Sequence, residues 1–244
     1  MTLLILLAAL GLSLVHLFAG KLRFLDGIPR SRWLSFAGGT SVAYVFLHLL
    51  PEVSEGQEVI AQAADGVLGF FEHHVYFVAF IGLTTFYGLE RIVRASRREQ
   101  QKTGEGKAGA RVFWLHIASF SVFNALVGYL LVERSESSPQ SLLFFFVAMA
   151  LHFVVSDFGL RQDHKDNYGR VGRWILAAAV FVGWSVGYFT HVSELMLSVL
   201  LSFLAGGIIL NVLKEELPEE RESRFPAFVF GGATYATLLL LSWL

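Results

Sequence analysis

The 244-residue chain contains no cysteine and few charged residues. The lack of cysteine excludes disulfides, thiol nucleophiles and cysteine-ligated metal sites. Charged residues make up only 16% of the chain, whereas a typical soluble domain has about a quarter. The formal net charge of −1 gives no sign of a nucleic-acid partner, and none is expected. What the chain has in abundance is hydrophobic residues, which account for 55% of the total.

Apolar runs close to the length of a bilayer-crossing helix, about 20 residues, recur along the chain. They predict an all-α integral membrane protein with eight transmembrane helices: Thr2–Ala19, Trp33–Leu50, Val67–Leu89, Val112–Val132, Ser141–Leu160, Trp174–Thr190, Leu195–Leu213 and Pro226–Leu244. The first run has no basic region before it and no clear cleavage site after it, so it is interpreted as a retained helix. Pro51 and the glutamate after it predict that the second helix ends there.

The basic residues predict how these helices are oriented. Of the 19 lysines and arginines, all but Arg134 fall in the connections that follow the first, third, fifth and seventh helices. Because lysine and arginine accumulate on the cytoplasmic side of a membrane, these connections are expected inside and both termini outside. The protein is therefore expected in a bacterial inner membrane or a plasma membrane, in contact with the lipid bilayer.

A short pattern occurs twice. Ala37–Gly39 is followed by Leu50–Glu52 (Leu-Pro-Glu), and Ala205–Gly207 by the same tripeptide at Leu217–Glu219. With the orientation above, the two copies run in opposite directions through the bilayer. This predicts an inverted repeat of helices one to three and six to eight around helices four and five, an arrangement found in secondary transporters. Chance agreement of two short motifs is the alternative.

One polar segment separates the third and fourth helices. It is rich in charged residues and glycine and has no aromatic residue within Ala95–Ala110. Such a composition favours disorder, so residues 94–111 are expected to form a flexible cytoplasmic loop. We expect no second domain, and residues 1–244 are taken as a single transmembrane domain.

Ionisable and polar side chains inside the predicted helices are candidates for a functional site, because burying them in a membrane is costly. Six lie on helices four and five and are candidate metal ligands: His152, Asn124, Ser156, Asp157, His116 and Ser121. From the helical rise we expect a central pair, His152 with Asn124, and an inner pair, His116 with Asp157. Imidazole, carboxylate and amide oxygen suit a zinc, manganese or iron ion. His16, near a helix end, is expected to bond locally.

The second and seventh predicted helices resemble those of a known family. Phe46–Glu52 (FLHLLPE) and Phe203–Glu219 (FLAGGIILNVLKEELPE) are similar to the corresponding helices of the ZIP metal transporters. The predicted count of eight helices, with both termini outside, agrees with that resemblance. It implies a helical bundle with inverted three-helix repeats, transport of zinc, iron or manganese into the cytoplasm, and a binuclear metal centre on helices four and five.

The ligand motifs of that family are only partly present. Where the family has His-Asn-x-x-Asp/Glu-Gly on helix four, this chain has Phe120–Ala125 (FSVFNA). Where the family has His-Glu-x-x-His/Glu-Glu on helix five, it has His152–Asp157 (HFVVSD). His152 is kept and Asp157 stands for the final acid, while the other ligands are replaced. A binuclear centre is therefore not expected, and at most one weak site remains.

Several hypotheses follow. The first is a ZIP-like transporter of a divalent metal cation, with the metal as cargo and no tightly bound cofactor. The alternative is a transport-inactive or repurposed protein of the same fold, acting as a scaffold, sensor or partner subunit. A haem protein using His116 and His152 is a third hypothesis, disfavoured because the two histidines differ in depth. No catalytic constellation occurs, so an enzyme is not expected. A homodimer is an open alternative.

Overall fold

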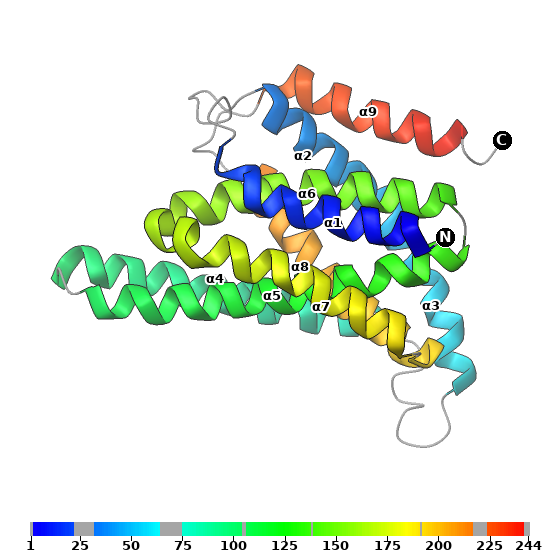
Figure 1. Ribbon diagram of the computed structural model, residues 1–244, viewed down its shortest axis with the longest axis horizontal. Coiled ribbons are helices and arrows are strands. Elements are labelled where there is room, and N and C mark those ends of the chain that lie inside the picture. Colours follow the sequence, from blue (N-terminus) through cyan, green and yellow to red (C-terminus); the bar gives the residue numbers. More distant parts are fainter. Residues whose placement is uncertain are drawn as a thin grey trace.

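The computed structural model describes residues 2–21, 32–63, 75–103, 106–137, 139–190, 192–216 and 224–241. Every regular element in this part of the chain is helical (Figure 1). In order, the elements are α1 (Thr2–Ala19), α2 (Arg32–Tyr44), the π-helix η2 (Val45–Leu49), α3 (Leu50–Ala63), α4 (Val75–Thr103), α5 (Gly106–Ser137), α6 (Pro139–Asn167), the π-helix η4 (Tyr168–Gly172), α7 (Arg173–Phe189), α8 (Glu194–Glu216) and α9 (Phe225–Leu241). The all-α prediction is confirmed.

Apolar helices long enough to cross a membrane dominate the fold. Within the described residues there are 7 of them, and α9 is a shorter apolar helix. Many large apolar side chains on their outer faces are exposed, among them Phe80 and Phe230. Such an exterior suits a multi-pass membrane protein, because lipid rather than water covers it.

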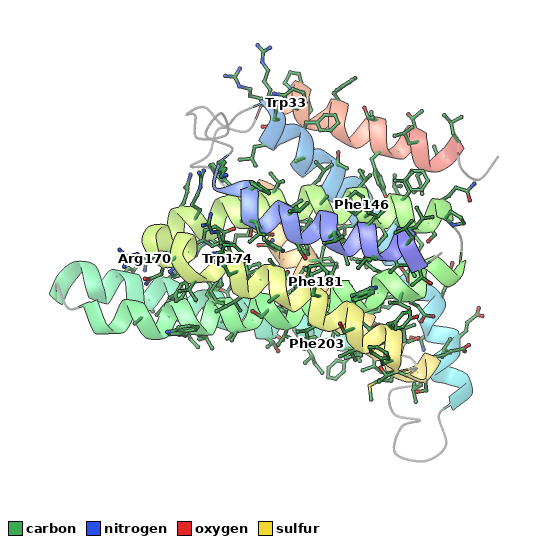
Figure 2. The ribbon with its side chains drawn as sticks, viewed as in Figure 1. Trp33, Phe146, Arg170, Trp174, Phe181 and Phe203 are labelled. Atoms are coloured by element: carbon green, nitrogen blue, oxygen red, sulfur yellow. The ribbon has the colours of Figure 1, made fainter. Side chains whose placement is uncertain are left out.

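The helices form one bundle in which both described ends of the chain lie at the same end. Thr2 begins α1 and Leu241 ends α9 at the right of Figure 1, and the end of α4, the start of α5 and η4 lie at the opposite end. Arg170 and Trp174 mark the α6–α7 turn, and Trp33 lies where α2 begins (Figure 2). Tryptophan is enriched where a membrane meets water. We refer to the end that carries Arg170 and Trp174, opposite Thr2 and Leu241, as the basic end.

Pro51 does not end the second helix, contrary to the sequence prediction. The helix continues through α3 to Ala63, and a π-turn over Val45–Leu49 precedes the proline. In this turn the Leu50 N–H bonds to the Val45 carbonyl. The wider turn accommodates a residue that cannot donate its own backbone hydrogen bond, so the helix passes the proline unbroken.

The prediction that residues 94–111 form a flexible loop is also wrong, because it missed the helical structure of this segment. α4 runs on to Thr103 and α5 begins at Gly106, so most of the segment is helical. Arginine, glutamate, glutamine, lysine and alanine, which dominate it, are all good helix formers. Arg94 also bonds to Glu90 one turn earlier. The two helices extend past the rest of the bundle as a hairpin (Figure 1).

α2 and α9 cross at two glycines. A Cβ atom on Gly39 would collide with the carbonyl oxygen of Phe228, and one on Gly231 with the carbonyl oxygen of Phe36. Each helix therefore offers a glycine to the backbone of the other. Only glycine permits two helix backbones to approach so closely.

α4 and α8 cross in the same way. Here a Cβ atom on Gly206 would collide with the Ala79 carbonyl oxygen, and one on Gly82 with the Phe203 carbonyl oxygen. In both crossings, each helix presents a glycine and, one turn earlier, a carbonyl that meets the glycine of the partner helix.

The two crossings share a register along the chain. Gly39 and Gly206 occupy equivalent places, and they are separated by the same number of residues as Pro51 and Pro218. The tripeptide Leu217–Glu219 itself lies outside the described residues. This register matches the crossing glycines and the prolines, but it is one residue out of step with the Ala-Gly-Gly segments. The π-helix η2 has no counterpart within α8.

Candidate functional site

Three buried polar side chains meet in the middle of the bundle. His16 on α1 lies with its Nδ1 atom 2.9 and 3.0 Å from the two carboxyl oxygens of Asp157 on α6. The Nε2 atom of His16 lies 2.8 Å from Nδ2 of Asn124 on α5. In this arrangement the imidazole donates from Nδ1 and accepts at Nε2, so both ring nitrogens are used. We call these three residues the buried triad.

Further hydrogen bonds tie the triad to α7 and its preceding π-turn. The amide of Asn124 also donates to the Leu176 carbonyl at 3.3 Å. The Tyr168 hydroxyl donates to the backbone carbonyl of His16 at 3.4 Å, and Ser13, one turn before His16, donates to the Ala177 carbonyl at 3.1 Å. The triad therefore links four helices, which is the arrangement expected of a structural clamp.

A second polar chain joins α6 to α8. Asn211 donates from Nδ2 to the Ser156 hydroxyl at 2.9 Å, and that hydroxyl lies 3.4 Å from Nε2 of His152. Aromatic rings surround the imidazole, with the centroid of Phe123 at 5.4 Å and that of Phe153 at 6.4 Å. His152 is buried, and its hydrogen bond with Ser156 leads to Asn211 on α8.

A third polar group surrounds Glu90 near the basic end. Its carboxylate pairs with Lys214 on α8 at 2.9 Å and with Arg94 on α4 at 3.0 Å. His116 on α5 places Nε2 3.8 Å from the same carboxylate and Nδ1 3.1 Å from His164. Glu90 is thus the negative centre of a cluster drawn from α4, α5, α6 and α8.

The second and third groups face one cavity. It has a volume of about 30 Å³, enough for a water molecule or a small ion. Residues of α4, α5, α6 and α8 line it: Phe86, Leu89, Glu90, His116, Ser119, Phe120, Phe123, His152, Gly207, Leu210, Asn211 and Lys214. We call it the inner cavity.

A wider and more open pocket adjoins the inner cavity. Its volume is about 490 Å³, and its lining is Tyr87, Glu90, Arg91, Arg94, Ala95, Arg98, Leu210, Leu213 and Lys214. Glu90, Leu210 and Lys214 line both spaces. The Glu90–Lys214 ion pair therefore stands between the inner cavity and this pocket, which we call the basic vestibule.

The structure distributes the six predicted ligands among different sites. His152 and His116 line the inner cavity, and Ser156 bridges His152 to α8. Neither predicted pairing is the one observed, because Asn124 and Asp157 both bond to His16. The expectation that His16 bonds locally is wrong: α1 packs against α6, and His16 and Ala19 in its last turn are buried.

The Ser121 hydroxyl bonds to the carbonyl of Ile117 on its own helix at 2.7 Å, and Ser121 is not among the residues that line the inner cavity. An intrahelical bond of this kind satisfies a serine in an apolar helix without a partner on another helix.

Three residues of the site escaped the sequence prediction. Glu90 and Lys214 each lie directly after an apolar run, at the point where a charged residue ends the predicted helix. They were therefore assigned to the cytoplasmic connections rather than to the membrane helices. Asn211 lies within the helix that carries the family-like motif. Its polar side chain in an apolar helix was a signal that could have been used.

Within the described residues, no group of three or more histidine, aspartate or glutamate side chains is arranged to hold a metal ion. His116 presents opposite ring nitrogens to Glu90 and His164, so these three do not converge on one point. Comparisons with protein-family models, with curated proteins and with solved structures find no match.

Proposed function

We propose that the chain is a ZIP-like membrane transporter that carries a divalent metal cation into the cytoplasm. The observation that supports this most directly is the inner cavity. It gathers the imidazoles of His116 and His152, the Glu90 carboxylate and the Asn211 amide from four helices. These are ligand types that zinc, manganese and iron accept, and they lie in a bundle whose exterior is apolar.

The paired glycine crossings support an inverted repeat. In the proposal, α2 corresponds to α8, and α9 corresponds to α4, because the same glycine-to-carbonyl pattern joins both pairs. Transporters with inverted repeats place the cargo between the halves and alternate by moving one half against the other. With α9 as the eighth span, both termini and the α7–α8 connection are proposed to lie outside.

Passage of a cation would require the inner cavity to open at the Glu90–Lys214 ion pair. In the described conformation the Glu90 carboxylate is held by Lys214 and Arg94. Release of Glu90 from these partners would free a carboxylate for the cation and join the cavity to the basic vestibule. We therefore assign the described conformation to a state closed on the cytoplasmic side.

The proposed route separates the members of both pairs expected from the sequence, His152 with Asn124 and His116 with Asp157. It passes His152, Asn211, His116 and Glu90, and it leaves the buried triad outside the path. The six sequence candidates are thus divided into a lining set and a structural set.

A repurposed protein of the same fold that does not transport is the second candidate. It is favoured by the aromatic side chains around His152, since Phe123 and Phe153 are both buried against the imidazole. The lack of a convergent ligand group among the described residues points the same way. In such a protein the polar groups would position helices rather than carry cargo.

Uptake into proteoliposomes tests the proposal. The purified chain is reconstituted with a fluorescent indicator inside the vesicles, and zinc or manganese is added outside. We expect His152→Ala to lower the initial uptake rate at least tenfold, because a buried ligand is lost. Thr84→Ala is the matched control, since that hydroxyl is exposed and bonds only within α4.

The outcomes separate the two candidates. Uptake by the natural chain that is lost in His152→Ala and kept in Thr84→Ala supports transport through the inner cavity. Uptake that His152→Ala leaves unchanged would overturn the route. No uptake of either metal, with the protein correctly folded in the vesicles, would favour the repurposed fold.

A further inference from the structure

The basic vestibule carries charge that metal transport does not explain. Four basic side chains line it, namely Arg91, Arg94, Arg98 and Lys214, against the single carboxylate of Glu90. Arg94 and Lys214 already pair with that carboxylate. A cation leaving the inner cavity would meet an excess of positive charge, so the vestibule is suited to an anion instead.

Helix geometry gathers the arginines on one side of α4. Arg91, Arg94 and Arg98 follow the spacing of residues that share a helix face. All three are exposed, and neither Arg91 nor Arg98 has an ion-pair partner within the described part of the chain. A guanidinium presents several N–H groups in a planar fork that matches the oxygens of a phosphate.

The position of the vestibule indicates where such a phosphate comes from. The apolar segment of α4 ends at Ile92 and that of α8 at Lys214, so the vestibule lies where both helices reach the membrane boundary. Its remaining walls include Tyr87, Leu210 and Leu213. Tyr87 and Leu213 are exposed and offer an apolar surface beside the charges. Basic side chains joined to a lipid-facing apolar wall fit a phospholipid better than a free ion.

We propose that the basic vestibule binds the phosphate-bearing headgroup of an anionic phospholipid. Arg91 and Arg98 hold the phosphate oxygens, and the acyl chains lie along the apolar wall formed by Tyr87 and Leu213. The general excess of basic residues on the cytoplasmic side accounts for their number. It does not account for their gathering around a concave space of about 490 Å³. The inference does not depend on metal transport.

Native mass spectrometry of the purified chain in detergent tests this. Phosphatidylglycerol is titrated in one arm and phosphatidylcholine in another, and a third arm adds excess inorganic phosphate to the phosphatidylglycerol complex. We expect saturable binding of phosphatidylglycerol at a stoichiometry that phosphatidylcholine does not reach. Arg91→Gln with Arg98→Gln should weaken that binding about 30-fold, from the usual contribution of two basic residues at an anionic membrane surface.

Two further variants make the result specific. Lys21→Gln with Arg170→Gln removes two exposed positive charges from the same end of the bundle, outside the vestibule, and should leave binding unchanged. Arg91→Lys with Arg98→Lys keeps the charge but loses the fork, and should weaken binding about threefold. Circular dichroism checks that each variant keeps its helices.

Three outcomes would overturn the proposal. Equal binding of the two lipids would mean ordinary solvation by lipid, and equal loss in both charge-removing double variants would mean a general surface charge effect. Displacement of phosphatidylglycerol by inorganic phosphate would identify a site for a free anion instead of a lipid.

Discussion

His16 illustrates how a polar residue is accommodated inside an apolar bundle. An imidazole has two nitrogens, and each must find a partner when water is excluded. Asp157 and Asn124, on two different helices, supply both. Both ring nitrogens of His16 are thus hydrogen-bonded, and the triad ties α1, α5 and α6 together.

Asp157→Ala should destabilise the protein by about 2 kcal/mol, because Nδ1 of His16 would be left buried without a partner. Thermal unfolding in detergent, followed by circular dichroism, measures this as a lower midpoint. Ser121→Ala is the control and should have little effect, since its hydroxyl bonds within its own helix. In His16→Ala with Asp157→Ala the losses should be less than additive. An unchanged midpoint for Asp157→Ala would contradict the clamp.

At this scale the sequence identified polar residues in apolar helices but not their partners. His152, His116, Asn124 and Asp157 were found because such residues are rare in a membrane. Their pairing depends on helix rotation and on which helices are neighbours, and neither follows from spacing within one helix. His16 was set aside because it lies close to the end of its apolar run, although that end is packed against α6.

At the scale of helices, apolar runs predicted the elements well and their ends poorly. Hydropathy falls where charge begins, so α4 and α5 were expected to stop at the membrane boundary. Their backbones continue because the charged residues there are themselves good helix formers. Pro51 shows the same limit, because the π-turn before it could not be recognised from composition.

The glycine crossings give a prediction that compares two distant helices. Gly39→Ala and Gly206→Ala should each lower stability by about 1–3 kcal/mol, because the added methyl group meets a carbonyl of the facing helix. Gly88→Ala is the control: no atom lies near its Cβ position, so a small gain of up to about 1 kcal/mol is expected. Thermal midpoints in detergent provide the comparison.

Similar losses for Gly39→Ala and Gly206→Ala, with none for Gly88→Ala, would support equivalent roles in the two crossings. A loss in only one of the two would mean that the repeated sequence no longer reflects repeated packing. Neither substitution removes a polar group of the inner cavity. Metal uptake by the two variants can therefore be compared with that of the natural chain at equal amounts of folded protein.

At the scale of the whole molecule, the sequence predicted an all-helical protein rich in candidate membrane helices, and this is confirmed. The distribution of lysine and arginine also predicted an orientation. In the described bundle, Thr2 and Leu241 lie at the same end (Figure 1). Which end faces the cytoplasm remains a prediction from charge.

The lack of cysteine makes that orientation simple to test, because any introduced thiol is unique. In intact cells, a membrane-impermeant maleimide should label Ser193→Cys in the α7–α8 connection. It should label Arg170→Cys, at the opposite end, only after the membrane is permeabilised. Both positions are exposed. Labelling in the reverse pattern would place the termini inside and contradict the charge rule for this chain.

Glu90 and Lys214 belong to the walls of both the inner cavity and the basic vestibule. A ligand that draws Lys214 away from Glu90 in one space therefore changes the charge presented to the other. By thermodynamic linkage, the coupling is reciprocal: a headgroup that favours release of Glu90 would strengthen cation binding in the cavity, and the cation would strengthen headgroup binding to the same degree. If the inner cavity binds a cation, the Glu90–Lys214 ion pair would thus make its affinity depend on the composition of the surrounding bilayer.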